Sequence, residues 1–450
     1  MKNKFYEISD IFAPAREEAE IQNITNNDVY KFYMLDFILN HPEYKDTPVE
    51  WKMTIRNPDI KTADIIPETQ LIEQLKAAQD ITGISIEEAQ YLENLEFDNW
   101  RKIFSKKTIN FLKTFKLPDF EIKNDWNWNY EMTFMGPWQN SMMWEIFGLK
   151  IINTLYLYNY VKREKITKNE FNQIIQTTLS RLFEDIKTFK SEGDTKFVEF
   201  WTRRSMSTDF QKIVNNILEE NLPGQYLWTS NVSIANQMNH KKVIWTNAHE
   251  LRMVTTALYD NPDDIINENY NVDIKWAEHF PELAILLPDT YGTTKYFENA
   301  PKEIIKNHSW NRIDSKDPFK AIPEYIDWVI ANWIDPMTKS VIPSDGLTAK
   351  EAIRITKAFK DKIWTIAFWI GTNLTNNTKD TWPRNDKNKS LFGSFSVVIK
   401  PSRVQRPDWT WVSTVKLSDN PNKATWDKAR VEKFKKIFGV SGFESEEVKV

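Results

Sequence analysis

The stretch Val243-Ile244-Trp245-Thr246-Asn247-Ala248-His249-Glu250 predicts a strand that runs through a polar turn into a helix. It opens with two β-branched residues, and the residues 251–258 behind it can continue as a helix. His249 is therefore expected where the strand ends. Of the five histidines, it alone combines this placement with a hydroxyl three residues earlier, at Thr246. Taken by itself, such a histidine is more often structural than catalytic.

Composition narrows the class of protein. The chain has 450 residues, enough for two or three domains, with 41% hydrophobic residues, 27% charged residues and a net charge of -4. This balance is typical of a soluble globular protein and gives no reason to expect a nucleic acid or a membrane as partner. The chain has no cysteine, which excludes disulfides and thiolate nucleophiles. No signal-like or membrane-spanning apolar stretch stands out, so a cytoplasmic location is expected.

Glycine and tryptophan occur in unusual proportion. The chain has 19 tryptophans but only 11 glycines. Average usage of glycine, about 7%, would give roughly 30 residues in a chain of this length. Glycine is therefore depleted, and tryptophan exceeds it.

The first 160 residues alternate between helical and extended patterns. The cluster Asn26-Asn27-Asp28 predicts the N-cap of a helix through residue 40, on which Tyr30 reads as a core residue. Strands are predicted at 49–56 and 131–138, helical segments over 67–117, and a long helix from Trp144 to Tyr160.

From about residue 195, seven short apolar runs each end in a polar cluster, several with a helical pattern behind. The runs are 197–200, 225–227, 243–244, 283–287, 311–313, 340–342 and 366–368. This form predicts an α/β fold with an irregular (β/α) barrel, whose active site lies at the carboxyl ends of the strands. A doubly wound sheet is the alternative. The polar ends are spread along the whole run, which favours the barrel.

The polar side chains at these ends suit phosphate chemistry. The acidic ones could hold magnesium through oxygen: Asp289, Asp314, Asp317 and Asp345. The forked cations suit a phosphate or carboxylate: Arg203, Arg204 and Arg312. Gly346 and Gly371 lie in short turns whose backbone N–H groups can cradle a phosphate. Ion pairing or capping explains each residue singly about as well, but not the whole set. The set predicts an enzyme that handles a phosphorylated sugar or nucleotide.

At these residues the sequence resembles the nicotinate phosphoribosyltransferase family, a type II phosphoribosyltransferase family, nearly end to end. The matching motifs are Asn26 to Phe32, Gly136-Pro137-Trp138, Trp144-Glu145, Thr202-Arg203-Arg204, Thr229 to Val232, Thr246-x-Ala248-His249-Glu250, Asp289 to Thr293, Arg312 to Pro318, Ser344 to Leu347, Ile370 to Thr375 and Lys416 to Asp419. Any one of them is weak, but all of them in this order are specific.

The resemblance implies a reaction. Nicotinate and phosphoribosyl pyrophosphate would give nicotinate mononucleotide and pyrophosphate in NAD biosynthesis, coupled to ATP hydrolysis with Mg²⁺. His249 matches the histidine that ATP phosphorylates, and Tyr30 would stack on the pyridine ring. Thr246 and Arg312 match nicotinate-contacting positions, with Arg312 as the partner of the carboxylate.

The remaining matched positions also receive roles by resemblance. Asp289 and Asp314 would face the ribose hydroxyls or the magnesium ion. The phosphoribosyl group would be bound by Ser344, Asp345, Gly346, Gly371 and Thr372, and further substrate contacts would come from Arg203, Arg204, Ser230 and Asn231. A homodimer is expected. The expected domains are an α+β domain over 1–150, the barrel over 151–385, and a segment over 386–450 that returns to the first domain.

The departures from the family are systematic. Tryptophan stands where the family has glycine at Trp201, Trp228, Trp245, Trp310, Trp333, Trp369 and Trp426. Trp138 and Trp144 stand where the family itself has tryptophan, and Lys316 replaces a loop glycine. Ser205-Met206 lacks a third arginine that is often found there. We hypothesise that the first six tryptophans are glycines in the natural protein, encoded by UGA codons that were translated as tryptophan.

Three functions are compatible with these observations. The first is an active nicotinate phosphoribosyltransferase. The second is an inactive phosphoribosyltransferase-like protein that binds a nucleotide or a partner, because indoles at active-site turns would obstruct the ligand. The third is a relative that uses nicotinamide or quinolinate. Retention of His249, Asp314, Asp345 and the arginines favours the first.

Overall fold

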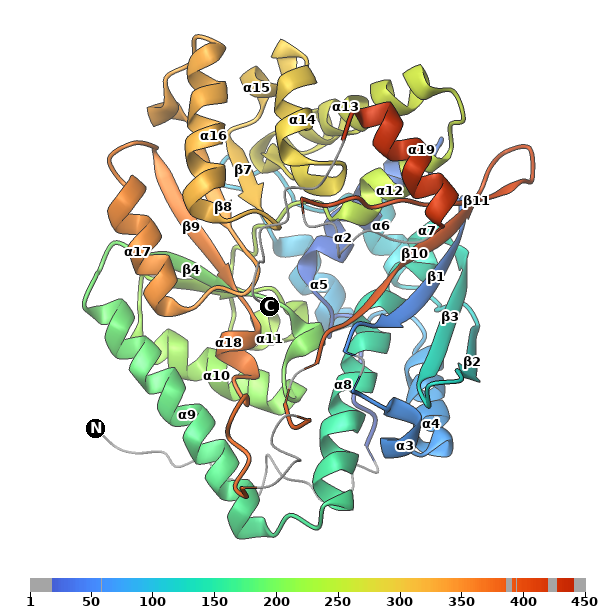
Figure 1. The fold of residues 1–450 in the computed structure, drawn as a ribbon, viewed down its shortest axis with the longest axis vertical. Helices are drawn as coiled ribbons and strands as arrows, with labels where there is room; N and C mark the ends of the chain where they lie inside the picture. The colour runs from blue at the N-terminus through green and yellow to red at the C-terminus, as the bar shows by residue number, and fades with distance from the viewer. Residues whose placement is uncertain (1–17, 58, 386–390, 394, 420–426, 441–450) are drawn as a thin grey trace.

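The computed structural model describes residues 18–57, 59–385, 391–393, 395–419 and 427–440. Two sheets organise this part of the chain (Figure 1). The first is antiparallel and the second is parallel, and the functional side chains lie between them.

The antiparallel sheet joins distant parts of the chain. Its order is β11-β10-β1-β3-β2, formed by β1 (Pro48–Ile55), β2 (Phe120–Asn124), β3 (Tyr130–Pro137), β10 (Val397–Gln405) and β11 (Trp411–Ser413). Helix α8 (Trp144–Arg163) packs against it. A Cβ atom at Gly148 of α8 would lie 2.7 Å from the Ile399 side chain, so glycine allows this close approach. The predicted strands at 49–56 and 131–138 and the predicted long helix are confirmed.

The parallel sheet has six strands in the order β5-β4-β9-β8-β7-β6. They are β4 (Lys196–Glu199), β5 (Tyr226–Thr229), β6 (Ile285–Leu286), β7 (Trp310–Ile313), β8 (Ser340–Pro343) and β9 (Thr365–Ile370). Because β9 pairs with β4, the strands follow one another around the sheet as in a (β/α) barrel that is open between β5 and β6. Helices α9, α10, α16 and α17 lie around its outside (Figure 1).

One predicted strand is wrong. Residues 243–248 belong to no strand. The carbonyl of Val243 accepts a hydrogen bond from the Tyr33 hydroxyl at 2.7 Å, and the Thr246 hydroxyl donates to the Ile285 carbonyl of β6 at 3.1 Å. The segment thus lies beside the open edge of the sheet and is held by side-chain bonds instead of a backbone ladder.

The remaining helices surround the two sheets. They are α2 (Val29–Asn40), α3 (Thr62–Ile65), α4 (Glu68–Gln79), α5 (Ile86–Asn94), α6 (Lys106–Leu112), α7 (Trp138–Ser141), α9 (Lys168–Lys190), α10 (Thr208–Asn221), α11 (Val232–Gln237), α12 (His249–Ala257), α13 (Pro262–His279), α14 (Thr293–Asn299), α15 (Lys302–Asn307), α16 (Pro318–Ala331), α17 (Ala349–Phe359), α18 (Thr372–Thr375) and α19 (Lys428–Phe438). Across the described ranges, none is long and apolar enough to cross a membrane.

Helix α2 is the central buried helix. All of its residues except the last are buried, and even Lys31 has no exposed surface. Asp28 takes the predicted N-cap position, but its carboxylate makes no cap bond. It instead accepts hydrogen bonds from the Thr202 backbone N–H at 3.0 Å and the Ser230 hydroxyl at 2.7 Å. Asp28 thus ties the start of α2 to the ends of β4 and β5.

Candidate active site

A pocket lies between the carboxyl ends of the parallel strands and the antiparallel sheet. The parallel side contributes Phe200, Trp201, Arg203, Arg204, Ala248, His249, Glu250, Met253, Arg312, Asp314 and Asp345. The other side contributes Tyr30, Trp51, Arg56, Glu145, Val398, Ile399, Lys400, Pro401 and Lys416. The space open to the centres of water molecules is about 90 Å³. This pocket therefore brings together side chains that lie far apart in the sequence.

His249 is the first residue of α12 and bonds to an aspartate from the next strand end. Its Nε2 atom lies 2.7 Å from Asp289 Oδ1 and 3.6 Å from Asp314 Oδ2. Burial lowers the pKa of His249 to about 4, against the opposing charge of Asp289. Burial raises the pKa of Asp289, but its contacts with His249, the charge of Lys416 and the hydrogen bond from Ser315 hold it well below its usual range. Since an ionised Asp289 can only accept, Nε2 carries the proton and Nδ1 keeps its lone pair.

Asp314 and Arg312 form a second pair at the end of β7. Arg312 Nη2 donates to Asp314 Oδ1 at 2.5 Å, and Arg312 Nε donates to the Ser344 hydroxyl at 3.1 Å. Ser344 in turn donates to Asp314 Oδ1 at 2.9 Å. Burial opposes the ionisation of Asp314, but Arg312 and His249 keep its pKa below the usual range. Within the described residues, Arg312 Nη1 has no hydrogen-bond partner, so it is available to an anion.

Glu145 of α8 gathers three side chains on the opposite wall. It accepts hydrogen bonds from the Tyr30 hydroxyl at 3.0 Å and from Arg203, and Lys31 Nζ lies 2.7 Å from its Oε2. Burial raises the pKa of Glu145, but Lys31 and Arg203 bring it down to about 2. Lys31 also bonds Glu250, whose pKa burial raises to about 8. Glu145 thus fixes the direction of Tyr30 and Arg203, and Glu250 faces α2.

The turns after β8 and β9 have the predicted tight geometry. Asp345 and Gly346 adopt φ values of 72° and 60°. A Cβ atom at Gly371 would lie 2.4 Å from the Phe200 carbonyl oxygen, so only glycine fits between the ends of β9 and β4. The Thr372 hydroxyl is buried and has no partner among the described residues.

Several candidates lie behind the pocket and support it. Ser230 is bonded to Asp28, and Asn231 caps α11 and donates to the Asn26 side chain at 2.8 Å. Thr246 is fully buried against β6. These three positions hold strand ends in place, and none of them is in the pocket lining.

Two acidic-loop residues point elsewhere. The Asp317 side chain caps α16 by accepting from the Phe319 N–H at 2.9 Å, and it is not part of the cluster of His249, Asp289 and Asp314, so its role as a magnesium ligand stays a prediction. Lys316 Nζ bonds to Glu324 at 2.8 Å and to the Thr294 hydroxyl at 3.1 Å, on the outer side of the loop. Aspartate is a preferred N-cap residue, and proline is favoured at the first helical position. The Asp317-Pro318 pair could therefore have predicted this cap from the sequence.

Three cations in the pocket lining received no role from the sequence. Arg56 directly follows β1, Lys400 lies on β10, and Lys416 follows β11. Burial and the charge of Lys416 lower the pKa of Lys400 well below its usual value. Lys416 Nζ lies 3.6 Å from Asp289 Oδ2. The motif Lys416 to Asp419 signalled this region, but only the fold shows that the antiparallel sheet supplies cations to the site.

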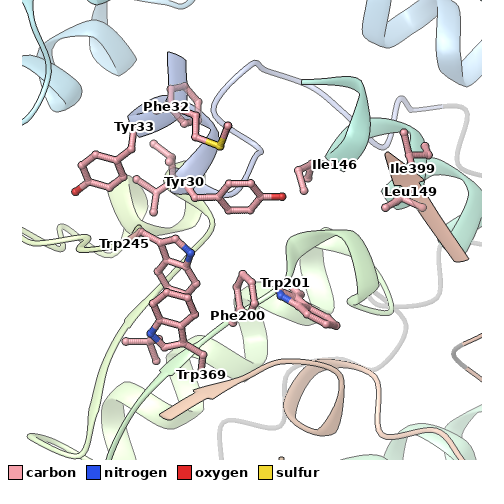
Figure 2. Packing of buried hydrophobic residues seen from close by; sticks show 14 of the residues in the cluster. Tyr30, Phe32, Tyr33, Ile146, Leu149, Phe200, Trp201, Trp245, Trp369 and Ile399 are labelled. Carbon is pink, nitrogen blue, oxygen red and sulfur yellow. The ribbon is translucent and has the colours of Figure 1, made fainter. Parts of the chain in front are cut away.

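Tryptophan rings occupy much of the space beside these side chains. Trp245 and Trp369 stack with ring centroids 3.9 Å apart and an angle of 18°, with Phe200 between them and Trp201 (Figure 2). The guanidinium carbons of Arg203 and Arg204 lie 4.6 and 4.3 Å from the Trp201 ring, and that of Arg312 lies 4.8 Å from Trp369. These indoles cover a planar face of each guanidinium group and leave the in-plane N–H groups as the part that can bind an anion.

Among the residues that the structure describes, one cluster can hold a metal ion. His249, Asp289 and Asp314 each offer a ligand atom, and these atoms lie within 4.8 Å of one another. Carboxylate oxygens suit magnesium better than an imidazole nitrogen does, so Asp289 and Asp314 are the fitting ligands.

The fold and the candidate site together indicate a class of enzyme. Paired carboxylates, a neutral histidine and several cations at the carboxyl ends of barrel strands are typical of an α/β enzyme that handles phosphorylated substrates. The family comparison is more specific. Residues 195–442 match the nicotinate phosphoribosyltransferase (NAPRTase) family, and residues 25–153 match the NAPRTase N-terminal domain. The chain therefore belongs to the nicotinate phosphoribosyltransferase family, which is a family of enzymes.

Solved structures share the fold. Nicotinate phosphoribosyltransferase from Porphyromonas gingivalis superposes with a TM-score of 0.77 at 23% identity, over 93% of this chain and 100% of the other. The enzyme of the same name from Vibrio cholerae gives a TM-score of 0.78 at 22% identity, over 94% and 95% of the two chains. At these identities the likeness establishes the fold, while the family match carries the activity.

Proposed function

We propose that the chain joins nicotinate to the ribose of phosphoribosyl pyrophosphate, releasing pyrophosphate, and that it hydrolyses ATP through a phosphorylated His249. The observation that carries this proposal is the partly buried His249, bonded to Asp289 and next to Asp314, in a pocket lined by arginines and lysines.

The surroundings of His249 support its proposed phosphorylation. With its pKa near 4, the ring is neutral at physiological pH, and the bond from Nε2 to Asp289 leaves the Nδ1 lone pair as the nucleophile. Nδ1 attacks the terminal phosphorus of ATP, the bond to the bridging oxygen breaks, and ADP leaves. Water then cleaves the N–P bond and releases phosphate. Asp289 stabilises the positive charge that the ring gains in the phosphorylated state.

The transfer step needs binding more than it needs acid–base chemistry. The pyridine nitrogen attacks the sugar carbon as the pyrophosphate leaves, through an oxocarbenium-like state. Tyr30, held by Glu145, offers a ring face for the pyridine, and Arg312 Nη1 is available to the nicotinate carboxylate. Arg203 and Arg204 supply positive charge for the departing pyrophosphate.

Magnesium would be held by Asp289 and Asp314 together with phosphate oxygens of the substrates. When bound, it would neutralise part of the charge on the pyrophosphate. The matching turns Ser344 to Gly346 and Gly371 to Thr372 would hold the phosphoribosyl phosphate, supported by the buried, unpaired Thr372 hydroxyl.

Two expectations stay predictions. We propose a homodimer on the resemblance alone, and sedimentation of the purified protein tests it. The cytoplasmic location likewise rests on the sequence.

The histidine proposal is tested by labelling. Protein incubated with γ-labelled ATP and magnesium should carry an acid-labile, base-stable label that is absent in His249→Asn. His279→Asn is a matched control, because His279 also pairs with an aspartate, Asp36, but outside the pocket. Label that persists in His249→Asn would remove this residue from the reaction.

A further inference from the structure

Tryptophan is concentrated at backbone positions that favour glycine. The described residues include eleven non-glycine residues with a positive φ, and five are tryptophans: Trp100, Trp128, Trp201, Trp333 and Trp409. Tryptophan makes up 19 of 450 residues, so chance would place fewer than one of them there. A bulky side chain in this region is a genuine steric outlier, and the pattern therefore needs a cause.

Three of the five occupy the same place in three hairpin loops: Trp100, Trp128 and Trp409, with φ of 64°, 62° and 67°. In the loop 97–101, the Phe97 N–H donates to the Arg101 carbonyl at 2.9 Å, and the Trp100 N–H donates to the Phe97 carbonyl at 2.9 Å. The loops 125–129 and 406–410 contain the same two bonds. This is the three-residue loop whose last residue is left-handed, where glycine is the preferred residue.

Trp333 ends α16 in another glycine motif. Its N–H donates to the Ile330 carbonyl, and the next N–H donates to the Val329 carbonyl at 3.2 Å. Helix α19 ends with the same two bonds and has Gly439, with φ of 64°, in the place of Trp333. Lys165 after α8 occupies the same motif, so the motif accepts a side chain; the unusual feature is that tryptophan recurs at left-handed positions.

At four of these positions the indole is largely exposed, so burial of the ring does not compensate for the strained backbone. The exposed fractions of Trp100, Trp128, Trp333 and Trp409 are 82%, 68%, 94% and 79%. Tryptophan is normally among the most buried residues on average, because its ring contributes most when it is removed from water. The backbone conformation and the exposure thus agree that these turns were not selected for an indole.

We propose that glycine is the natural residue at positions 100, 128 and 409, as well as at 201 and 333. The codon at each would be UGA, read as glycine in the source cell and as tryptophan in this sequence. The hairpin positions carry this inference without reference to any family motif or to the proposed function. For the site, it means that the Trp201 ring beside Arg203 and Arg204 is absent from the natural protein.

The direct test is to sequence peptides of the protein isolated from its source cells by tandem mass spectrometry. We expect glycine at 100, 128 and 409, and tryptophan at Trp51, whose indole is bonded to Ser141. Tryptophan at the three hairpin positions would overturn the proposal.

A second test uses the chain as written. The triple variant with Gly at 100, 128 and 409 is compared with a matched triple alanine variant, which removes the same rings but keeps Cβ atoms. A left-handed position penalises alanine, so the glycine variant should melt a few degrees higher. Equal melting temperatures would show that these turns do not demand glycine and would overturn the proposal.

Discussion

Tryptophans in the two sheet regions meet different surroundings. Beside the antiparallel sheet, the Trp51 indole donates to the Ser141 hydroxyl at 3.0 Å, and the Trp144 indole donates to the Pro118 carbonyl at 2.9 Å. At the ends of the parallel strands, the buried indole N–H groups of Trp201, Trp228 and Trp245 have no partner among the described residues. A buried unpaired donor is costly, so the second group does not belong to a well-matched core.

Trp138 differs from the other tryptophans beside the antiparallel sheet. Trp138 lies at the end of the antiparallel sheet, is fully buried, and also lacks a partner for its indole N–H. An unpaired indole alone therefore does not identify a misplaced tryptophan. Trp201 differs because its unpaired indole is combined with a left-handed φ of 92° and with a place in the lining of the candidate pocket.

The largest expected effect comes from exchanging tryptophan for glycine in each region. Trp144→Gly should destabilise the protein by about 3–5 kcal/mol, because Trp144 stacks on Phe134 at 4.7 Å and fills the core below the sheet. Trp201→Gly should cost much less or stabilise, because it relieves the backbone and removes an unpaired donor. Urea unfolding of both variants measures this, and equal losses would break the comparison.

The second prediction compares the loss of an arginine at the ends of the parallel strands with the loss of one in the antiparallel sheet. Arg312→Ala should weaken nicotinate binding by about 2–5 kcal/mol if its guanidinium pairs with the carboxylate. The control is Arg403→Ala, because Arg403 of β10 pairs with Glu50 away from the pocket. Michaelis constants for nicotinate, measured in the glycine-restored protein, should rise for the first variant alone. An unchanged constant in Arg312→Ala would exclude it from the nicotinate site.

The third prediction concerns pH and His249. Its pKa is about 4 in the folded protein and near 6.5 when unfolded, so the unfolded chain binds a proton first as pH falls. The neutral His249 therefore makes its full contribution to the free energy of unfolding above pH 6.5. As the pH falls from 6.5 to 4, that free energy decreases by roughly 3 kcal/mol. Other groups titrate in this range, so the measured quantity is the difference in unfolding free energy between the original protein and His249→Asn. A difference that does not change with pH would contradict the neutral histidine.

The sequence predicted the strands well and their side-chain geometry only in part. The alternation of apolar runs and polar clusters predicted the positions of six parallel strands, because the end of a strand depends mainly on residues close to it in the sequence. The prediction is wrong at Val243-Ile244. The β-branched residues there favour a strand, but the Val243 carbonyl accepts a hydrogen bond from the Tyr33 hydroxyl instead of from a neighbouring strand.

The site was predictable where motifs are contiguous, and less so elsewhere. The meeting of His249, Asp289 and Asp314 at one edge follows from the barrel geometry. Nothing local reveals that Arg56, Lys400 and Lys416 arrive from another sheet, because that depends on how β1 and β10 pair. The fixing of Tyr30 by Glu145 also depends on a contact across 115 residues.

The most direct test of the central claim is product formation by the chain with glycine at 201, 228, 245, 310, 333 and 369. Incubated with nicotinate, phosphoribosyl pyrophosphate, ATP and magnesium, it should form nicotinate mononucleotide, detected by chromatography. The same protein carrying His249→Asn should lose the ATP-dependent part of this rate. Consumption of nicotinamide or quinolinate with no reaction of nicotinate would contradict the assigned substrate. Full binding of both substrates with no product from any of the three would contradict the assignment as an enzyme.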